Sequence, residues 1–147
     1  MNAYAEMKKK HQQEVNDFPM FFAFSDKQFA EGMKSLGLEP EDTDKIYSLR
    51  GTGGFYRKSD SQKLHDMFAR HEQERKDAIA ADQTGEGFIY EMFDYELANH
   101  EYGYTRDISD AIRALGLSVD EINSNPKMLH GLKKARKEQE EWYNEHN

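Results

Sequence analysis

The stretch GFIYEMFDYELANHEYGYT, residues 87–105, places a carboxylate and an imidazole where a helix would otherwise bury apolar side chains. At helical spacing Ile89 and Phe93 share a face with Glu96 and His100, which lie one turn apart. A buried carboxylate needs a partner, so this face predicts either a working site or a hydrogen-bonded pair inside a helical core. We favour the structural pair, because internal polar networks commonly imitate sites.

A metal site is the competing interpretation. His71 lies on the apolar stripe of the preceding helix, and a helical hairpin across DQTGEG, residues 82–87, would let it face Glu96 and His100. Two imidazoles and one carboxylate are ligands that zinc or iron(II) accepts. The spacing Glu-x-x-x-His, however, differs from the Glu-x-x-His motif of di-iron helix bundles. A metal-dependent enzyme therefore stays an alternative, whereas the favoured interpretation predicts no catalytic residues and no cofactor.

The stretch RGTGGFYRKS, residues 50–59, could cradle a phosphate, because backbone donors beside basic side chains form anion-binding concavities. It lacks the Gly-Lys-Ser/Thr sequence of a Walker loop. Glycines between two alternating runs are typical of a hairpin turn, and we favour that interpretation. The residues of the alternative phosphate site are Arg50, Gly51, Gly53, Gly54, Arg57 and Lys58.

The net charge of −8 comes from one segment of the chain. Residues 82–121 contain ten acidic residues and two basic ones, Arg106 and Arg113, so this segment alone contributes −8. Such a surface repels nucleic-acid phosphates and could imitate them for a basic protein. We therefore expect a basic protein partner, such as a nucleic-acid-binding effector, and no membrane partner. The acidic residues expected on this surface are Glu91, Asp94, Glu101, Asp107 and Asp110.

Direct binding of a nucleic acid is a third hypothesis. The overall negative charge disfavours it, although a local patch of basic residues would attract phosphates. The residues of such a patch are Lys8, Lys9, Lys10, Arg50, Arg57 and Lys58.

Short strands are predicted in two places within a chain dominated by helical periodicity. MFFAFS, residues 20–25, is an apolar run after Pro19, and alternating runs around the glycines predict a hairpin over about 45–58. We therefore predict one α+β domain over residues 1–147. It is mostly helical, with a small two- or three-stranded antiparallel sheet.

Helix starts and stops follow familiar signals. Ser25, Ser59 and Ser118 each precede Gln or Glu by three residues, which is the capping-box pattern that opens a helix. Asn125 precedes proline, which favours the first helical position. The helix of the opening stretch is expected to end at Gly103.

The composition is that of a folded, highly charged protein. Its 147 residues suffice for one core, to which nine Phe, eight Tyr and one Trp contribute large apolar areas. There is no cysteine, which excludes disulfides and thiolate chemistry, and there is no apolar run of membrane-spanning length. The N-terminus lacks the apolar core of a secretory signal. We therefore expect a cytoplasmic protein.

One family of proteins resembles this chain in FAFSDKQFAEGMKSLGLEPEDTDKIYS, GGFYRKSD, GEGFIYEMFDYELANHEY and ALGLSVDEIN. These are small acidic proteins encoded by gut Firmicutes, often on phages and conjugative elements. The resemblance covers nearly the whole chain and implies a bacterial accessory role without an established enzymatic activity. Compact acidic proteins of such elements include anti-CRISPR proteins. We therefore expect a non-enzymatic protein-binding accessory or regulatory protein, such as an inhibitor of a nucleic-acid-binding host-defence protein.

Overall fold

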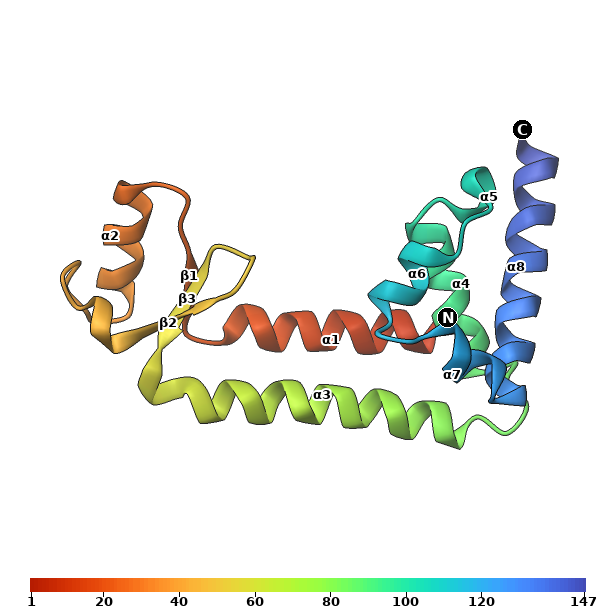
Figure 1. Cartoon of the computed structure of the whole chain (residues 1–147), viewed down its shortest axis with the longest axis horizontal. Coiled ribbons are helices and arrows are strands. Elements are labelled where there is room, and N and C mark those ends of the chain that lie inside the picture. Colours follow the sequence, from red (N-terminus) through yellow and green to blue (C-terminus); the bar gives the residue numbers. More distant parts are fainter. The chain divides into compact units, whose positions relative to one another are not determined.

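The computed structural model describes residues 1–147, of which about 68% are helical, and contains one three-stranded antiparallel sheet (Figure 1). The predicted mostly helical α+β class is confirmed.

The chain divides into two compact units: unit 1 comprises residues 1–11 and 74–147, and unit 2 comprises residues 12–73. The prediction of one domain stays a prediction. Both unit boundaries fall inside long helices, which are α1 (Ala3–Asp17) and α3 (Ser61–Ala81).

Unit 2 contains the sheet and a helix packed on it. Its elements, besides parts of α1 and α3, are β1 (Met20–Phe22), α2 (Asp26–Ser35), η1 (Thr43–Lys45), β2 (Ile46–Leu49), β3 (Gly54–Arg57) and η2 (Lys58–Asp60). The strand order is β1-β3-β2, so β3 pairs antiparallel with both neighbours. In Figure 1 α2 lies beside the sheet, and it contacts β1. The predicted hairpin is confirmed, and the first strand is shorter than predicted.

Phenylalanine rings form the core of unit 2. Phe21 and Phe55 lie opposite each other on β1 and β3, with ring centroids 5.4 Å apart. Phe29 of α2 packs edge-on against these two rings at 5.7 and 5.3 Å, and Met33 is fully buried beside them. A Cβ at Gly32 would lie 2.0 Å from the Phe21 ring, so α2 approaches the sheet closely because this position lacks a side chain.

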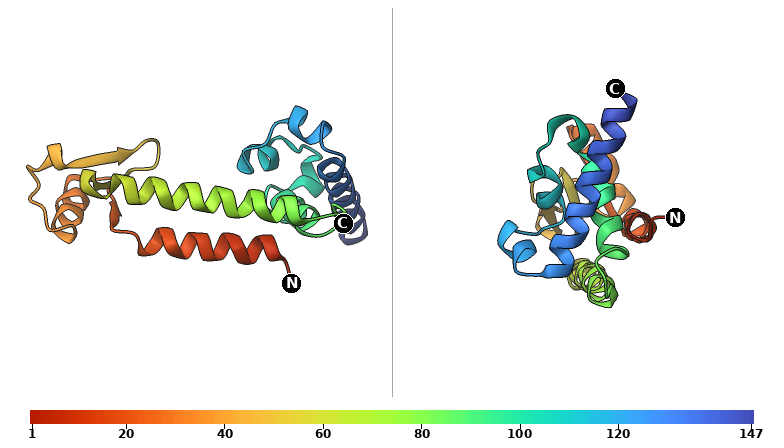
Figure 2. Two further views of the ribbon diagram at one scale, coloured as in Figure 1. Left: turned by 90° about the horizontal axis from the view of Figure 1, so that it is seen from below. Right: turned by 90° about the vertical axis from the view of Figure 1, so that its right-hand side faces the viewer.

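Unit 1 is helical throughout. Besides parts of α1 and α3 it contains α4 (Phe88–Asn99), α5 (Tyr102–Thr105), α6 (Ser109–Ala114), α7 (Val119–Asn123) and α8 (Pro126–His146). α4 contacts α5, α6 and α8, while α5 and α7 also contact α8. Figure 2 (right) looks onto α8, with α6 and α7 to one side of it. None of the helices combines the length and the apolar character that crossing a bilayer requires.

The apolar face of α4 forms the centre of the core of unit 1. Ile89, Met92 and Phe93 are at most 1% exposed, and Glu96 on the same face is also 1% exposed. The predicted helical face is therefore confirmed, including its buried carboxylate. Because this face is packed by α1, α6 and α8 residues, α4 determines how the rest of unit 1 assembles.

The end of α4 differs from the prediction. The helix stops at Asn99, so the prediction that it continues to Gly103 is wrong. Glu101 adopts the left-handed conformation with φ of 57°, and the four-residue α5 begins after it. Gly103 instead allows the backbone of α5 to lie close to α8, since a Cβ there would lie 3.0 Å from the Cβ of Tyr143 in α8.

The helix starts follow the predicted caps with one exception. Ser25 and Asn125 accept backbone hydrogen bonds at the starts of α2 and α8. Ser118 forms a reciprocal capping box at the start of α7. The prediction that Ser59 caps a helix is wrong, because the 3-10 helix η2 occupies this position and α3 begins at Ser61.

We expect Phe93→Ala to lower the free energy of unfolding by about 3–5 kcal/mol, because the truncation leaves a cavity in a close-packed core. Urea unfolding followed by circular dichroism measures the loss. The matched control is Phe24→Ala, which should cost about 1 kcal/mol or less. Phe24 is 78% exposed, whereas Phe93 is 0% exposed. Equal losses for the two variants would show that the buried face of α4 is wrongly assigned.

Candidate functional site

The carboxylate of Glu96 joins α4 to the first part of α1. Its Oε2 accepts hydrogen bonds from the hydroxyl of Tyr4 and, at 3.0 Å, from the ammonium of Lys8. Its Oε1 has no hydrogen-bond partner and lies 3.9 Å from Nδ1 of His100. That Nδ1 donates to the backbone carbonyl of Glu96 at 2.8 Å, so the imidazole caps the end of α4. The structure thus brings Glu96 and His100 together.

Sequence reasoning missed the two α1 residues that contact Glu96. Tyr4 and Lys8 lie four residues apart, which puts them on one face of a helix. That spacing is a signal in the sequence, but we interpreted Lys8 as part of a basic patch. In the structure the Lys8 side chain is 45% exposed and ion-paired with Glu96, while Lys9 and Lys10 are exposed.

His71, the third proposed metal ligand, lies in unit 2 beside Glu14. Its Nε2 is 3.3 Å from Oε2 of Glu14, which also pairs with the guanidinium of Arg70. The hydrogen bond from Arg70 has the largest effect on Glu14 and lowers the pKa of this carboxyl to about 2. No group of three or more His, Asp or Glu side chains is arranged to hold a metal ion. The structure therefore does not assemble His71, Glu96 and His100 into a ligand set.

The glycine-rich stretch forms the turn between β2 and β3. Gly51 and Gly53 have φ of 80° and 76°, which other residues rarely adopt. A Cβ at Gly53 would lie 2.5 Å from the ring of Phe24, so this glycine also makes room for an exposed aromatic side chain. Arg57 bonds internally, with its Nε 2.8 Å from Oδ2 of Asp60 and its Nη1 donating to the end of α2 at 3.1 Å.

The remaining residues of the alternative phosphate site also have structural contacts. Gly54 is buried in β3, and a Cβ there would lie 2.9 Å from the ring of Phe22. Lys58 places its ammonium 5.1 Å from the ring centroid of Tyr47. Arg50 is exposed in the turn. The turn and its packing explain why the glycines are present, and two of the three basic residues have contacts inside the chain. The only support for phosphate binding is therefore the sequence pattern.

Two of the acidic residues predicted on the surface bond inside unit 1 and are only partly exposed. Glu91 accepts a hydrogen bond from the backbone N–H of Ala3 at the start of α1. Asp94 accepts a hydrogen bond from the side chain of Gln139 in α8 at 2.8 Å. Both carboxylates therefore help to assemble unit 1, a role that their spacing along the sequence did not indicate.

The other three predicted acidic residues are exposed. Asp107 accepts a hydrogen bond from the N–H of Ser109 at 2.8 Å, and hydrogen bonds from this serine lower the pKa of Asp107. Asp110 pairs with Arg113 at 2.9 Å. Glu101 differs from both, because its carboxylate has no hydrogen bond or ion pair within the chain.

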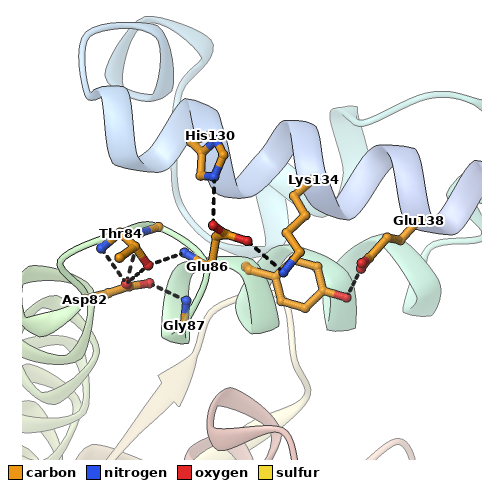
Figure 3. A network of polar contacts seen from close by, with 9 residues as sticks. Asp82, Thr84, Glu86, Gly87, His130, Lys134 and Glu138 are labelled. Carbon is orange, nitrogen blue, oxygen red and sulfur yellow. Dashed lines mark hydrogen bonds and ion pairs between the residues drawn. The ribbon is translucent and has the colours of Figure 1, made fainter.

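The DQTGEG stretch is a structured turn that fixes the start of α4 (Figure 3). Asp82 accepts four backbone hydrogen bonds, from Thr84 at 3.2 Å, Gly85 at 2.9 Å, Gly87 at 3.1 Å and Ile89 at 3.0 Å. Burial by itself raises the pKa of Asp82, but these hydrogen bonds outweigh it and lower the pKa below its ordinary value. The carboxylate is therefore occupied by the turn itself.

Further polar contacts attach α8 to α4 and to the preceding turn (Figure 3). Glu86 lies 3.0 Å from the ammonium of Lys134 and 3.5 Å from Nε2 of His130. Tyr90 of α4 donates its hydroxyl to Glu138 and carries the Lys134 ammonium 4.4 Å from its ring centroid. Residues far apart in the sequence thus meet in one network, which no local pattern predicts.

Tyr102 attaches α5 to α8 through its hydroxyl, as Tyr90 attaches α4 to α8. Its hydroxyl donates to Oε2 of Glu140 at 2.6 Å and accepts a hydrogen bond from Nε of Arg136 at 2.8 Å. Burial, and then the bond to Glu140, raises the pKa of Tyr102. Glu140 also pairs with Arg106 at 3.1 Å. These contacts fix the short helix α5 beside the C-terminal part of α8.

An open groove of about 560 Å³ lies between α5 and α8, a size within the range of about 300–1,000 Å³ of small-ligand sites. Sequence reasoning missed this groove, although an exposed tryptophan near the end of the last helix is a signal for one. Tyr104 and Trp142 beside it are 73% and 58% exposed. The groove is lined by Glu101, Gly103, Tyr104, Gln139, Trp142 and Tyr143.

Comparison with known protein families identifies a match over most of the chain. The model of DUF7659, a family of unknown function, matches residues 3–138, so the chain belongs to this family. No curated protein and no solved structure was found to match it. The match therefore supports the family identity and leaves the function to be argued from the geometry.

We expect Tyr4→Phe to lower the free energy of unfolding by about 1–3 kcal/mol, because it removes a hydrogen bond from a buried carboxylate. The matched control is Tyr104→Phe, because Tyr104 is 73% exposed and its hydroxyl has no partner in the chain. The control should stay within about 0.5 kcal/mol of the parent in urea unfolding. If the two variants are equally stable, Tyr4 does not satisfy Glu96.

The same contact predicts a loss of stability at alkaline pH. Burial, and then the hydrogen bond to Glu96, raises the pKa of Tyr4 above its ordinary value of 10.0. Tyr4 therefore stays protonated in the folded chain where it ionises in the unfolded chain. Its contribution is complete below about pH 10 and is lost as the pH rises above that value. We expect the urea midpoint to fall between about pH 9 and pH 11, and to fall less in Tyr4→Phe. If the urea midpoint falls equally in the parent and in Tyr4→Phe, the ionisation of Tyr4 does not cause the loss of stability.

Proposed function

We propose that this member of DUF7659 is a non-enzymatic protein-binding module that binds a basic protein through exposed acidic residues between residues 82 and 121. In its most specific form, the proposal is an accessory protein of a bacterial mobile element that acts in the cytoplasm. There it occupies the nucleic-acid-binding surface of a host-defence protein. The resemblance to acidic proteins of phages and conjugative elements supports this setting, as the family match supports the identity of the chain.

The observation that carries the proposal is that both basic residues of the acidic segment, residues 82–121, form ion pairs with carboxylates of the chain. Arg106 and Arg113 are the only basic residues between residues 82 and 121. Arg106 lies 3.1 Å from Glu140, and Arg113 lies 2.9 Å from Asp110. Both are therefore already engaged by carboxylates, and the segment keeps an excess of acidic over basic residues.

The acids available to a partner are those that are exposed and do not hold unit 1 together. Asp110 is bound only to Arg113, and both side chains are largely exposed. Asp120 is exposed on α7, and no side-chain hydrogen bond or ion pair engages its carboxylate. Exposed charges of one sign steer an oppositely charged protein during association more than they hold the complex. A basic nucleic-acid-binding surface is a partner of that charge.

The alternatives have less support in the geometry. A metal enzyme would need a ligand set, and only Glu96 and His100 come together. A nucleic-acid binder would need a patch of free basic residues, whereas two of the six predicted ones are ion-paired, Lys8 with Glu96 and Arg57 with Asp60. No specific contact favours either alternative over protein binding.

The experiment that tests the proposal is affinity capture from a bacterial host lysate, followed by association kinetics with the purified partner. We expect the double reversal Asp110→Lys with Asp120→Lys to slow association about tenfold at low salt. The effect should shrink at about 0.5 M salt, because ions screen exposed charges.

The matched control is the double reversal Glu141→Lys with Glu145→Lys on α8, where both residues are exposed. Each double variant changes the net charge by the same amount, from −8 to −4. The control should change the association rate about twofold or less, since its charges lie outside the proposed surface. If both double variants associate like the parent, or are slowed equally, the acidic surface does not select the partner.

A further inference from the structure

We propose that the groove between α5 and α8 binds a lysine or arginine side chain of the basic partner. The contacts would be the carboxylate of Glu101 and the exposed rings of Tyr104 and Trp142. This inference rests on the proposed function, because it names the chemistry that holds the partner after its charges have been attracted. It uses residues that the charge-reversal experiment leaves unchanged, so the two proposals can fail separately.

The walls of the groove are aromatic and inclined to each other. The rings of Tyr104 and Tyr143 have centroids 6.3 Å apart and planes at 57°. Trp142 stacks on His146 with centroids 4.2 Å apart, but His146 is not among the residues that line the groove. Faces of tyrosine and tryptophan rings carry negative potential and attract ammonium and guanidinium groups. The groove is therefore lined by two kinds of ring that attract cations.

The position of Glu101 suggests a role outside the chain. Its φ of 57° lies in the left-handed region, where glycine is favoured and a side chain adds strain. Glu101 lines the groove, and its carboxylate has no hydrogen bond or ion pair within the chain. The lining residue Gln139 donates to a second carboxylate, that of Asp94, at 2.8 Å. The negative charge of Glu101 favours a positive ligand.

Unit 1 already places two of its own arginines beside tyrosine rings, and it pairs Arg106 with a carboxylate as well. The Arg136 guanidinium lies 5.6 Å from the ring centroid of Tyr102, and that of Arg106 lies 5.8 Å from the ring centroid of Tyr143. Arg106 is neutralised by Glu140 at 3.1 Å, so it does not cancel the charge of Glu101. The groove repeats the arrangement with Glu101, Tyr104 and Trp142, beside which no cation of the chain lies, whereas its third ring, Tyr143, already receives Arg106.

Trp142 provides a direct measurement, because it is the only tryptophan in the chain. The probes are a blocked Gly-Arg-Gly-Arg-Gly peptide and the same peptide with citrulline, which keeps the shape of arginine without its charge. We expect the arginine peptide to change Trp142 fluorescence saturably, and the citrulline peptide to bind about tenfold more weakly. Equal binding of the two peptides, or no binding of either, would overturn the inference.

Variants at one position separate ligand binding from folding. Glu101→Gln should weaken binding of the arginine peptide about tenfold. Glu101→Gly should weaken binding while raising the melting temperature, because glycine relieves the left-handed strain. Glu141→Gln, an exposed change on α8 outside the groove lining, should bind like the parent. If the Glu101 variants bind the peptide as tightly as Glu141→Gln, the groove does not recognise the cation.

The captured partner distinguishes this inference from the proposed function. A partner that tolerates Glu101→Gln but is slowed by the reversal of Asp110 and Asp120 supports the acidic surface and rejects the groove. A partner that is lost with Glu101→Gln and unaffected by the reversal supports the groove and rejects steering by α6 and α7.

Discussion

The burial of the Glu96 carboxylate is the interaction on which the assembly of unit 1 depends. Glu96 shares the face of α4 that buries Ile89 and Phe93, so it is removed from water together with the apolar core. A buried carboxylate without donors is strongly unfavourable, and α4 itself has no free donors to offer it. Tyr4 and Lys8 supply those donors, which means that the first part of α1 must lie against α4 for the core to form.

The parts of the fold that follow from short spacings in the sequence were predictable. The buried face of α4 follows from helical periodicity, and the turn between β2 and β3 follows from glycines at positive φ. The end of α4 at Asn99 was not predictable, because the left-handed glutamate that follows it, Glu101, has no local signal. Gly103 is not a helix stop for a related reason. Its missing side chain accommodates Tyr143, forty residues later in the sequence.

The candidate site was harder to predict than the fold, because its residues are joined by long-range pairs. Tyr90 meets Glu138, and Tyr102 meets Glu140, only after α8 has packed against α4 and α5. A sequence shows that such residues are present, but not which acid each tyrosine will contact. The acidic segment illustrates the same limit. Its charge was correctly counted, yet the division between acids that support the structure and acids that face solvent depends on the packed helices.

This division constrains the proposed recognition of a partner by unit 1. A carboxylate that accepts a hydrogen bond inside the fold, as Glu91 and Asp94 do, would lose that bond if it turned outward to a partner, and unit 1 would be destabilised. A carboxylate without internal bonds can bind a cation at no such cost. Glu101 meets that condition and also adopts a backbone conformation that glycine would adopt more easily. Glutamate at this position therefore costs the fold some stability relative to glycine.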